Sequence, residues 1–261
     1  MKLLLSNDDG ILSPGLLALA KGLSDEHEIT IAAPDSERSA VSHAITFTLP
    51  LRVNEAKLQG LEGVQAYAVN GTPADCIKVA LGNLCEWPDM VISGINIGAN
   101  KGTDVFYSGT VSAAMEGALL GIPSIAISNI SYRPSRFEAS VEAVKYTMAL
   151  MERDRYRSML MNVNAPDAQA ADIKGFVITP AGKQCYELQY HEREDPRKQK
   201  YYWTPVKRLT THVPGEDNDE RWTNEGYVTL TPLLMDLTDN SGITRLRALA
   251  DSRCNAEGDM I

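Results

Sequence analysis

The chain has 261 residues, of which 44% are hydrophobic and 23% are charged, an ordinary balance for a globular protein with a large core. Its formal net charge is -9, which argues against a nucleic-acid backbone or an anionic membrane as a partner held by bulk charge. No stretch reaches the length of a membrane span, and the apolar run before Asp8 is too short for a signal peptide. We therefore expect a cytoplasmic protein.

The first half of the chain alternates short β-like runs with helical ones. Ser13 followed by Pro14, and Thr72 followed by Pro73, are typical of helix N-caps. This βαβ rhythm predicts an α/β fold with a doubly wound, mostly parallel sheet and helices on both faces. We expect strands at residues 2–6, 28–33, 89–93 and 124–128, and helices at residues 14–23, 72–84, 111–120 and 136–151.

The character of the chain changes after about Ala165. Residues 189–200 are dense in charge, which favours a solvated hairpin tip or arm over a charged binding site, and such arms often pair with another subunit. Residues 213–224 are expected to form a mobile polar loop, and the tail from Asp251 to be disordered. We divide the chain into an α/β core over residues 1–165 and a C-terminal extension over residues 166–261. The extension is expected to contain strands at 177–179, 201–203 and 227–231.

The cysteines and histidines limit the metal chemistry open to the chain. None of the four histidines lies at H-x-x-x-H spacing, and the four cysteines lack C-x-x-C spacing. A zinc site of His and Cys ligands is therefore disfavoured, and any metal is expected to be a hard cation bound by oxygen. The cysteines are expected to be free thiols rather than a disulfide framework. They are Cys76, Cys85, Cys185 and Cys254.

Asn7-Asp8-Asp9-Gly10 follows directly after the first apolar strand. Open α/β sheets bind their ligands at this carboxyl end of a strand. Neighbouring aspartates repel, so a site that keeps both ionised usually holds a cation. The alternative is a solvated Asp-Gly turn with no chemical role.

Three later segments carry donors and acceptors suited to phosphate. Ser39 follows the second strand, and a doubly wound sheet places that loop beside Asp8 and Asp9. Residues 91–102 carry three glycines and two asparagines, but match neither the P-loop nor the dinucleotide fingerprint. In residues 107–117 a Ser-Gly-Thr turn opens a helix whose first turn bears no acidic residue, and such a helix start is a ready cradle for phosphate. Each segment alone is equally an ordinary loop or cap, whereas together they predict metal-assisted phosphate chemistry.

With these segments in view, the chain closely resembles the SurE family of survival-protein nucleotidases, which hydrolyse nucleoside 5'- and 3'-monophosphates. The matching segments follow one another in order across nearly the whole chain. They are LLSNDDG (4–10), APDSERSA (33–40), VNGTPADC (69–76), PDMVISGINIGAN (88–100), YSGTVSAAMEGALLGIPSIAIS (107–128), NVNAP (162–166) and EGYVTLTPLLMDLT (225–238).

The resemblance implies a three-layer α/β/α, Rossmann-like core, with C-terminal arms exchanged between the subunits of a homodimer or homotetramer. It also implies one divalent metal ion per subunit, Mn²⁺ or Mg²⁺. The implied metal ligands are Asp8, Asp9, Ser39 and Asn96, and the implied phosphate contacts are Asn100, Ser108, Gly109 and Thr110.

The chain departs from the family pattern at three places. Ala40 replaces a usual glycine, so the turn after Ser39 is expected to differ slightly. Lys101 replaces a usual leucine, and we expect its side chain to face solvent. Residues 216–224 are more polar than their usual counterpart, which leaves their packing open.

The hypothesis from these residues is phosphomonoester hydrolysis at a single-metal site. The cation would acidify a water and neutralise phosphate charge, while Asp8 or Asp9 orients or deprotonates that water. A covalent aspartyl-phosphate is the alternative route, with an aspartate as nucleophile. A non-catalytic nucleotide sensor is the alternative function. A serine hydrolase would need a G-x-S-x-G elbow, which is missing, and a haloacid-dehalogenase-type phosphatase would need one residue between its two aspartates.

Overall fold

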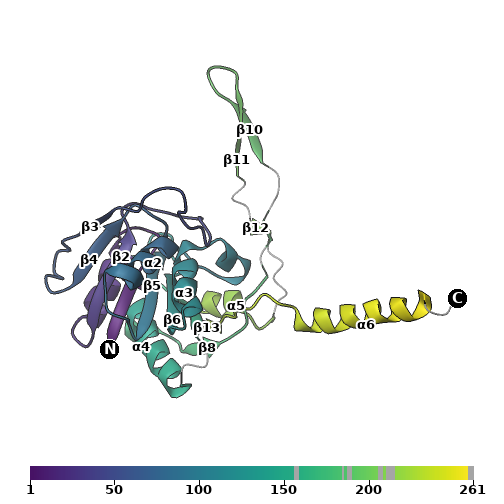
Figure 1. Cartoon of the computed structure of the whole chain (residues 1–261). Coiled ribbons are helices and arrows are strands. Elements are labelled where there is room, and N and C mark those ends of the chain that lie inside the picture. Colours follow the sequence, from purple (N-terminus) through teal and green to yellow (C-terminus); the bar gives the residue numbers. More distant parts are fainter. Residues whose placement is uncertain (156–158, 184, 187–189, 205–207, 210–214, 258–261) are drawn as a thin grey trace.

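A nine-stranded sheet runs through the middle of the molecule (Figure 1). The structure is a computed structural model that describes residues 1–155, 159–183, 185–186, 190–204, 208–209 and 215–257. The strand order is β3-β4-β2-β1-β5-β6-β7-β13-β8. These strands are β1 (Lys2–Ser6), β2 (Glu28–Pro34), β3 (Val53–Glu55), β4 (Gln65–Val69), β5 (Met90–Ile97), β6 (Ser124–Asn129), β7 (Leu160–Ala165), β8 (Phe176–Ile178) and β13 (Val228–Pro232).

The six strands from β4 to β7 are all parallel, while β3 and β13 pair antiparallel with their neighbours β4 and β7. From β1 the chain first builds outward through β2 and β4, and then returns to add β5 on the other side. The strand order therefore reverses between β1 and β5. Ligand sites of doubly wound sheets lie at the carboxyl ends of the strands at such a switch point.

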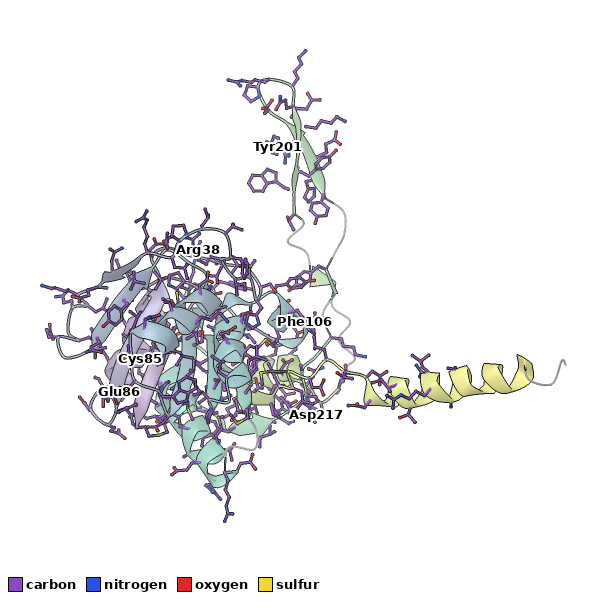
Figure 2. All side chains as sticks on the ribbon, viewed as in Figure 1. Arg38, Cys85, Glu86, Phe106, Tyr201 and Asp217 are labelled. Carbon is purple, nitrogen blue, oxygen red and sulfur yellow. The ribbon has the colours of Figure 1, made fainter. Side chains whose placement is uncertain are left out.

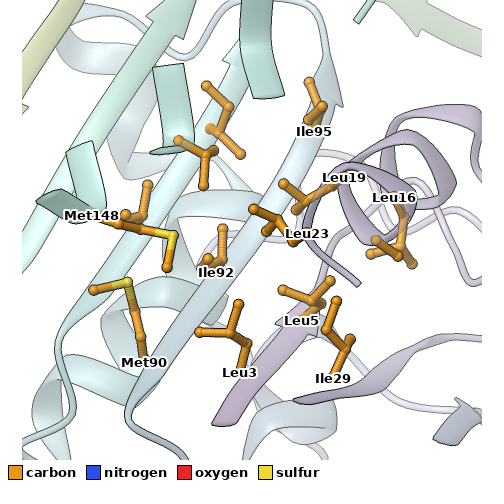
Figure 3. Packing of buried hydrophobic residues seen from close by; sticks show 14 of the residues in the cluster. Leu3, Leu5, Leu16, Leu19, Leu23, Ile29, Met90, Ile92, Ile95 and Met148 are labelled. Atoms are coloured by element: carbon orange, nitrogen blue, oxygen red, sulfur yellow. The ribbon is translucent and has the colours of Figure 1, made fainter. Parts of the chain in front are cut away.

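Helices cover both faces of the sheet, which confirms the predicted α/β fold in three layers. Because successive side chains of a strand point to opposite faces, Leu3 and Leu5 pack with Leu16 and Leu19 on one face (Figure 3). Leu4 packs on the other face. The core on the face of Leu3 and Leu5 also contains residues of the helices α1 and α4. The core on the face of Leu4 contains residues of α2 and α3. The helices are α1 (Pro14–Leu23), α2 (Pro73–Asn83), α3 (Gly109–Leu119), α4 (Glu138–Arg153), α5 (Asp219–Asn224) and α6 (Asn240–Glu257), with short 3-10 turns η1 (Gly102–Phe106) and η2 (Ala170–Asp172).

The helix starts predicted from capping signals are confirmed. The Ser13 hydroxyl accepts a hydrogen bond from the Leu16 amide at 3.3 Å, and Pro14 is the first residue of α1. Thr72 caps α2 in a reciprocal capping box with Asp75. These signals act within one helical turn, so the local sequence is enough to specify them.

The sheet differs from the prediction in two respects: β5 is longer than predicted, and three further strands are present. Residues 94–97 were expected to be loop, but after a register shift β5 resumes pairing with β6, Asn96 opposite Ser128. The extension carries Asn96 to the carboxyl end of the sheet. Strands β3, β4 and β7 were not predicted, although NVNAP was noted as a motif and supplies the end of β7.

The C-terminal part extends away from this core. The predicted arm is an antiparallel hairpin of β10 (His191–Glu194) and β11 (Lys200–Trp203), with Tyr201 displayed far from the body (Figure 2). A second small pair, β9 (Cys185–Tyr186) and β12 (Arg208–Leu209), lies at its base. Helix α6 points away from the body in another direction (Figure 1).

Two expectations for the C-terminal part are wrong. Residues 219–224 form the helix α5, because Asn218 caps it by accepting the Arg221 amide, and not a mobile loop. Residues 251–257 belong to α6. Residues 215–218 belong to no helix or strand, and residues 213–214 and 258–261 lie outside the described part of the chain.

Cys76 and Cys85 are free thiols, as expected, while the side chains of the other two cysteines lie outside the described part. Among the described residues, no helix combines the length and the apolar character required to cross a bilayer.

Candidate functional site

A cavity of about 590 Å³ opens at the carboxyl ends of β1 and β5, at the switch point of the sheet. It brings together Asp8, Asp9, Ser39, Asn96, Asn100 and Ser108, all of which were predicted as site residues. Its remaining lining residues are Glu37, Ala40, Ile97, Ala99, Asp104, Tyr107, Tyr132 and Tyr186.

The turn after β1 is shaped by Asn7. The Asn7 side chain donates to the Gly10 carbonyl at 3.0 Å and to the Ser13 hydroxyl at 2.8 Å, and accepts from the Gly10 amide at 3.2 Å. Gly10 has a φ of +99°, which side chains with a Cβ rarely adopt. The tight turn leaves Asp8 and Asp9 side by side in the wall of the cavity.

The two carboxylates are held by groups from other segments of the chain. The Thr110 hydroxyl donates to Asp8 Oδ1, and the Asp9 carboxylate accepts the Ile97 amide at 3.1 Å. The Arg38 amide donates to the Asp8 carbonyl at 2.7 Å, so the loop after β2 does lie beside the loop after β1. These contacts join four segments of the chain at one point.

The electrostatics of the pair favour a bound cation. Burial raises the pKa of Asp8, despite the hydrogen bond from Thr110. Burial, and then the charge of Asp8, raise the pKa of Asp9 to about 6. Among the described residues, no Lys, Arg or His forms an ion pair with either carboxylate. Two adjacent carboxylates, one buried and one half-buried, without a counter-charge among the described residues are a donor set that suits a hard divalent cation.

Ser39 and Asn96 complete the oxygen donors around the cavity. The Ser39 hydroxyl donates to Glu37 Oε1 at 2.6 Å. Asn96 Nδ2 donates to the Gly98 carbonyl at 2.7 Å, which commits the amide nitrogen and fixes the orientation of the side-chain oxygen. Ala40, next to Ser39, has a φ of +55°, a left-handed conformation that suits the glycine usual at this position. Among the described residues, no three His, Cys, Asp or Glu side chains form a group that could hold a metal ion. The donors that could hold a cation here are the two carboxylates together with the neutral oxygens of Ser39 and Asn96.

Asn100 is anchored by residues that the sequence motifs did not assign to the site. Its backbone N–H donates to Asn164 Oδ1 at 3.0 Å. Its backbone carbonyl accepts from Asn162 Nδ2 at 2.8 Å and from Asn164 Nδ2 at 3.0 Å. Asn100 Nδ2 donates to the Ser128 hydroxyl at 2.9 Å. An asparagine amide has two N–H groups, so a second donor remains for a ligand. The alternation of asparagines in NVNAP was the available signal, because it places both side chains on one face of β7.

The start of α3 lies directly against the carboxylates. The Ser108 hydroxyl accepts the Val111 amide at 3.1 Å, so Ser108 is the N-cap. A Cβ at Gly109 would lie 2.8 Å from Asp8 Cβ, so only glycine allows this approach. The first turn carries no acidic residue, which leaves the positive end of the helix dipole facing the cavity.

The expectation that Lys101 faces solvent is wrong. Its side chain is buried, and its Nζ donates to the Thr223 hydroxyl at 3.1 Å. The reason is that α5, which was not predicted, covers the loop and supplies polar partners.

Comparisons with known proteins identify the family of the chain. The sequence profile of the family described as Survival protein SurE matches residues 3–188. The chain belongs to the SurE family. It is 45% identical to a 5'-nucleotidase SurE of Natranaerobius thermophilus over 247 residues, 92% of this chain and 95% of that protein. It is 41% identical to a 5'-nucleotidase SurE of Thermosipho melanesiensis over 251 residues, 94% and 96% of the two chains.

The SurE fold is shared as well. The crystal structure of the SurE protein from Aquifex aeolicus superimposes with a TM-score of 0.76 at 34% sequence identity, covering 96% of this chain and all of that chain. The SurE profile spans every predicted site residue, while the β10–β11 hairpin and α6 lie beyond its end.

Proposed function

We propose that this chain is a divalent-metal-dependent 5'-nucleotidase, which hydrolyses nucleoside 5'- and 3'-monophosphates to nucleoside and phosphate. The name shared by its SurE relatives supports the activity. The observation that carries the proposal is the Asp8–Asp9 pair, one carboxylate buried and the other half-buried. The pair lacks a cationic partner among the described residues, and Asp8 lies against the N-terminus of α3. A helix N-terminus and a metal-binding carboxylate pair in one cavity suit a phosphoryl group.

Asp8, Asp9, Ser39 and Asn96 would hold one Mn²⁺ or Mg²⁺. The hard oxygen donors and the raised pKa of Asp9, which a cation would lower again, fit such an ion. When bound, the ion supplies charge neutralisation for the phosphate and a more acidic water.

The remaining residues bind the phosphate and move the proton. Asn100 and the first turn of α3, at Ser108 and Gly109, donate hydrogen bonds to phosphoryl oxygens as charge shifts during transfer. For Thr110, whose hydroxyl donates to Asp8, the predicted phosphate contact stays a prediction. Asp9, the more exposed carboxylate, orients the attacking water or accepts its proton. The water oxygen bonds to phosphorus while the ester P–O bond breaks, and the leaving oxygen takes either the proton that Asp9 accepted from the water or one from solvent. An aspartate as nucleophile is the alternative.

Three tyrosines at the mouth of the cavity provide a place for the nucleoside. Tyr107, Tyr132 and Tyr186 line the same cavity as the carboxylates and are exposed. Aromatic rings stack on any base without reading its hydrogen-bonding edge. The cavity volume also falls in the range of small-molecule sites.

The C-terminal residues 166–261 are proposed to serve assembly into a homodimer or homotetramer, while residues 1–165 carry the metal and phosphate site. The hairpin exposes Tyr201, Tyr202 and Trp203 on a two-stranded sheet that projects from the body (Figure 2). A two-stranded sheet is marginal in water by itself, so contacts with another subunit would stabilise it. The cytoplasmic location stays a prediction.

The test is phosphate release from a panel of nucleoside monophosphates with Mn²⁺ or Mg²⁺, with and without EDTA. We expect metal-dependent release by the wild type and none by Asp9→Asn. Asp25→Asn, on an exposed residue after α1, is the matched control. Nucleotide binding without release by the metal-loaded wild type would overturn the proposal in favour of a nucleotide sensor.

A further inference from the structure

Two of the chain's departures from the SurE pattern meet in the folded protein. Lys101 replaces a usual leucine, and α5 belongs to a segment that is more polar than its usual counterpart. Lys101 is 5% exposed, Asp219 0% and Thr223 2%. We call these three residues the Asp219 cluster. Burying a lysine and a carboxylate lowers the stability of the fold unless the two groups are paired and hydrogen-bonded. Their hydrogen bonds show which segments these groups hold in place.

Asp219 accepts hydrogen bonds from two distant segments. Its Oδ2 accepts the Gly102 amide at 2.8 Å, and its Oδ1 accepts the Gly182 amide at 2.9 Å. Lys101 Nζ donates to the Thr223 hydroxyl, which in turn donates to the Asp219 carbonyl at 2.8 Å. Asp219 therefore ties the start of η1 to the segment that leads into the arm.

The loop fixed by this cluster is the one that carries Asn100. Gly102 follows Asn100 by two residues, and Asp104 and Tyr107, further along the same loop, line the cavity. On its other side Asn100 is held by Asn162 and Asn164. The loop is thus held between β7 and α5, and on the α5 side Lys101 is the residue that departs from the family pattern.

We propose that Asp219 is a positioning residue for the Asn100 loop: its two carboxylate oxygens fix the Gly102 and Gly182 amides, and Lys101 balances its charge in the buried site. Asp219 itself lines no part of the cavity. The expected effect on kcat rests on the proposed function, because that function assigns Asn100 to the binding of a phosphoryl oxygen.

The test separates the acceptor role of Asp219 from its charge. In Asp219→Asn, one carboxylate oxygen becomes an NH2 group that cannot accept an N–H, and the negative charge near Lys101 is removed. Adding Lys101→Leu removes the buried positive charge but does not restore the lost acceptor. We expect the double variant to regain a melting temperature within about 3 °C of the wild type. Its kcat should remain lower by on the order of tenfold, for nucleoside monophosphates and for p-nitrophenyl phosphate alike.

Hydrogen exchange gives a readout that does not depend on activity. Amides of residues 98–106 should exchange faster in the double variant than in the wild type, while Glu225→Gln, at the exposed end of α5, should change neither exchange nor kcat. Wild-type kcat or wild-type exchange in the folded double variant would overturn the proposal.

Thr223→Val tests the same loop if the double variant does not fold. It removes only the hydroxyl that receives Lys101, and should accelerate exchange of residues 98–106 and lower kcat by a smaller amount. No change in either measurement would again overturn the proposal. If the wild type releases no phosphate, the proposed function fails, and exchange alone then decides whether Asp219 fixes the loop.

Discussion

Without metal, Asp9→Asn should fold into a more stable protein than the wild type at neutral pH, although it should be inactive. Burial and the charge of Asp8 raise the pKa of Asp9 from an ordinary 3.8 to about 6. The folded state therefore binds a proton that the unfolded state has already lost between these two values. For a carboxyl shifted in this direction, stability is greatest in acid and falls as the pH rises from about 4 to 6.

The magnitude follows from the shift. About two pKa units at roughly 1.4 kcal/mol each give a ceiling of about 3 kcal/mol. Asp9 is only partly buried, so solvent screening reduces this to roughly 1–2 kcal/mol. Asparagine keeps the shape of the side chain and an acceptor for the Ile97 amide, but carries no charge to repel Asp8.

The assay is urea unfolding in EDTA at about pH 7.5 and about pH 4.5, where Asp9 is protonated in the folded wild type. The advantage of Asp9→Asn should shrink to below about 1 kcal/mol at the lower pH. Adding Mn²⁺ at roughly a hundredfold over its Kd should stabilise the wild type by about 2.7 kcal/mol and the variant far less. Asp25→Asn should follow the wild type throughout. Equal or lower stability of Asp9→Asn in EDTA at pH 7.5, or an advantage independent of pH, would refute the reasoning.

Three further predictions concern backbone space and the mouth of the cavity. Gly109→Ala should lower kcat/KM by about a hundredfold, because the added Cβ would lie 3.0 Å from Asp8 Oδ2. The control is Gly82→Ala, whose added Cβ meets nothing within 4 Å. This variant should retain activity, and its free energy of unfolding in urea should rise by up to about 1 kcal/mol. Ala40→Gly should raise the free energy of unfolding by up to about 1 kcal/mol, since it relieves a φ of +55°; a loss of stability would contradict this strain. Tyr132→Ala should raise KM for nucleoside monophosphates by about tenfold in steady-state assays but leave KM for p-nitrophenyl phosphate unchanged, and an equal rise for both would exclude base stacking.

The local sequence determined the features that depend on neighbours in the chain. Ser13 with Pro14, and Thr72 with Pro73, start their helices because a cap is completed within one turn. The alternation of Leu3, Leu4 and Leu5 between two cores follows from the twofold repeat of a strand.

The carboxylates and the fold class were also readable from the sequence alone. Asp8 and Asp9 directly follow an apolar strand, and the βαβ rhythm leaves such a turn at the ligand-binding edge of the sheet. The family motifs then supplied the expected roles of the later serines and asparagines, which neither composition nor spacing could assign.

Tertiary structure alone decided what each polar residue contacts across long stretches of chain. Asn100 is anchored by Asn164, 64 residues away, and Lys101 is buried against Thr223, 122 residues away. The extension of β5 to Asn96 likewise depends on pairing with β6 beyond an irregularity. Burial is a property of what packs over a residue. Lys101 was predicted to be exposed because it lies in a glycine-rich loop. The helix α5, which was itself predicted to be a loop, covers it in the folded protein.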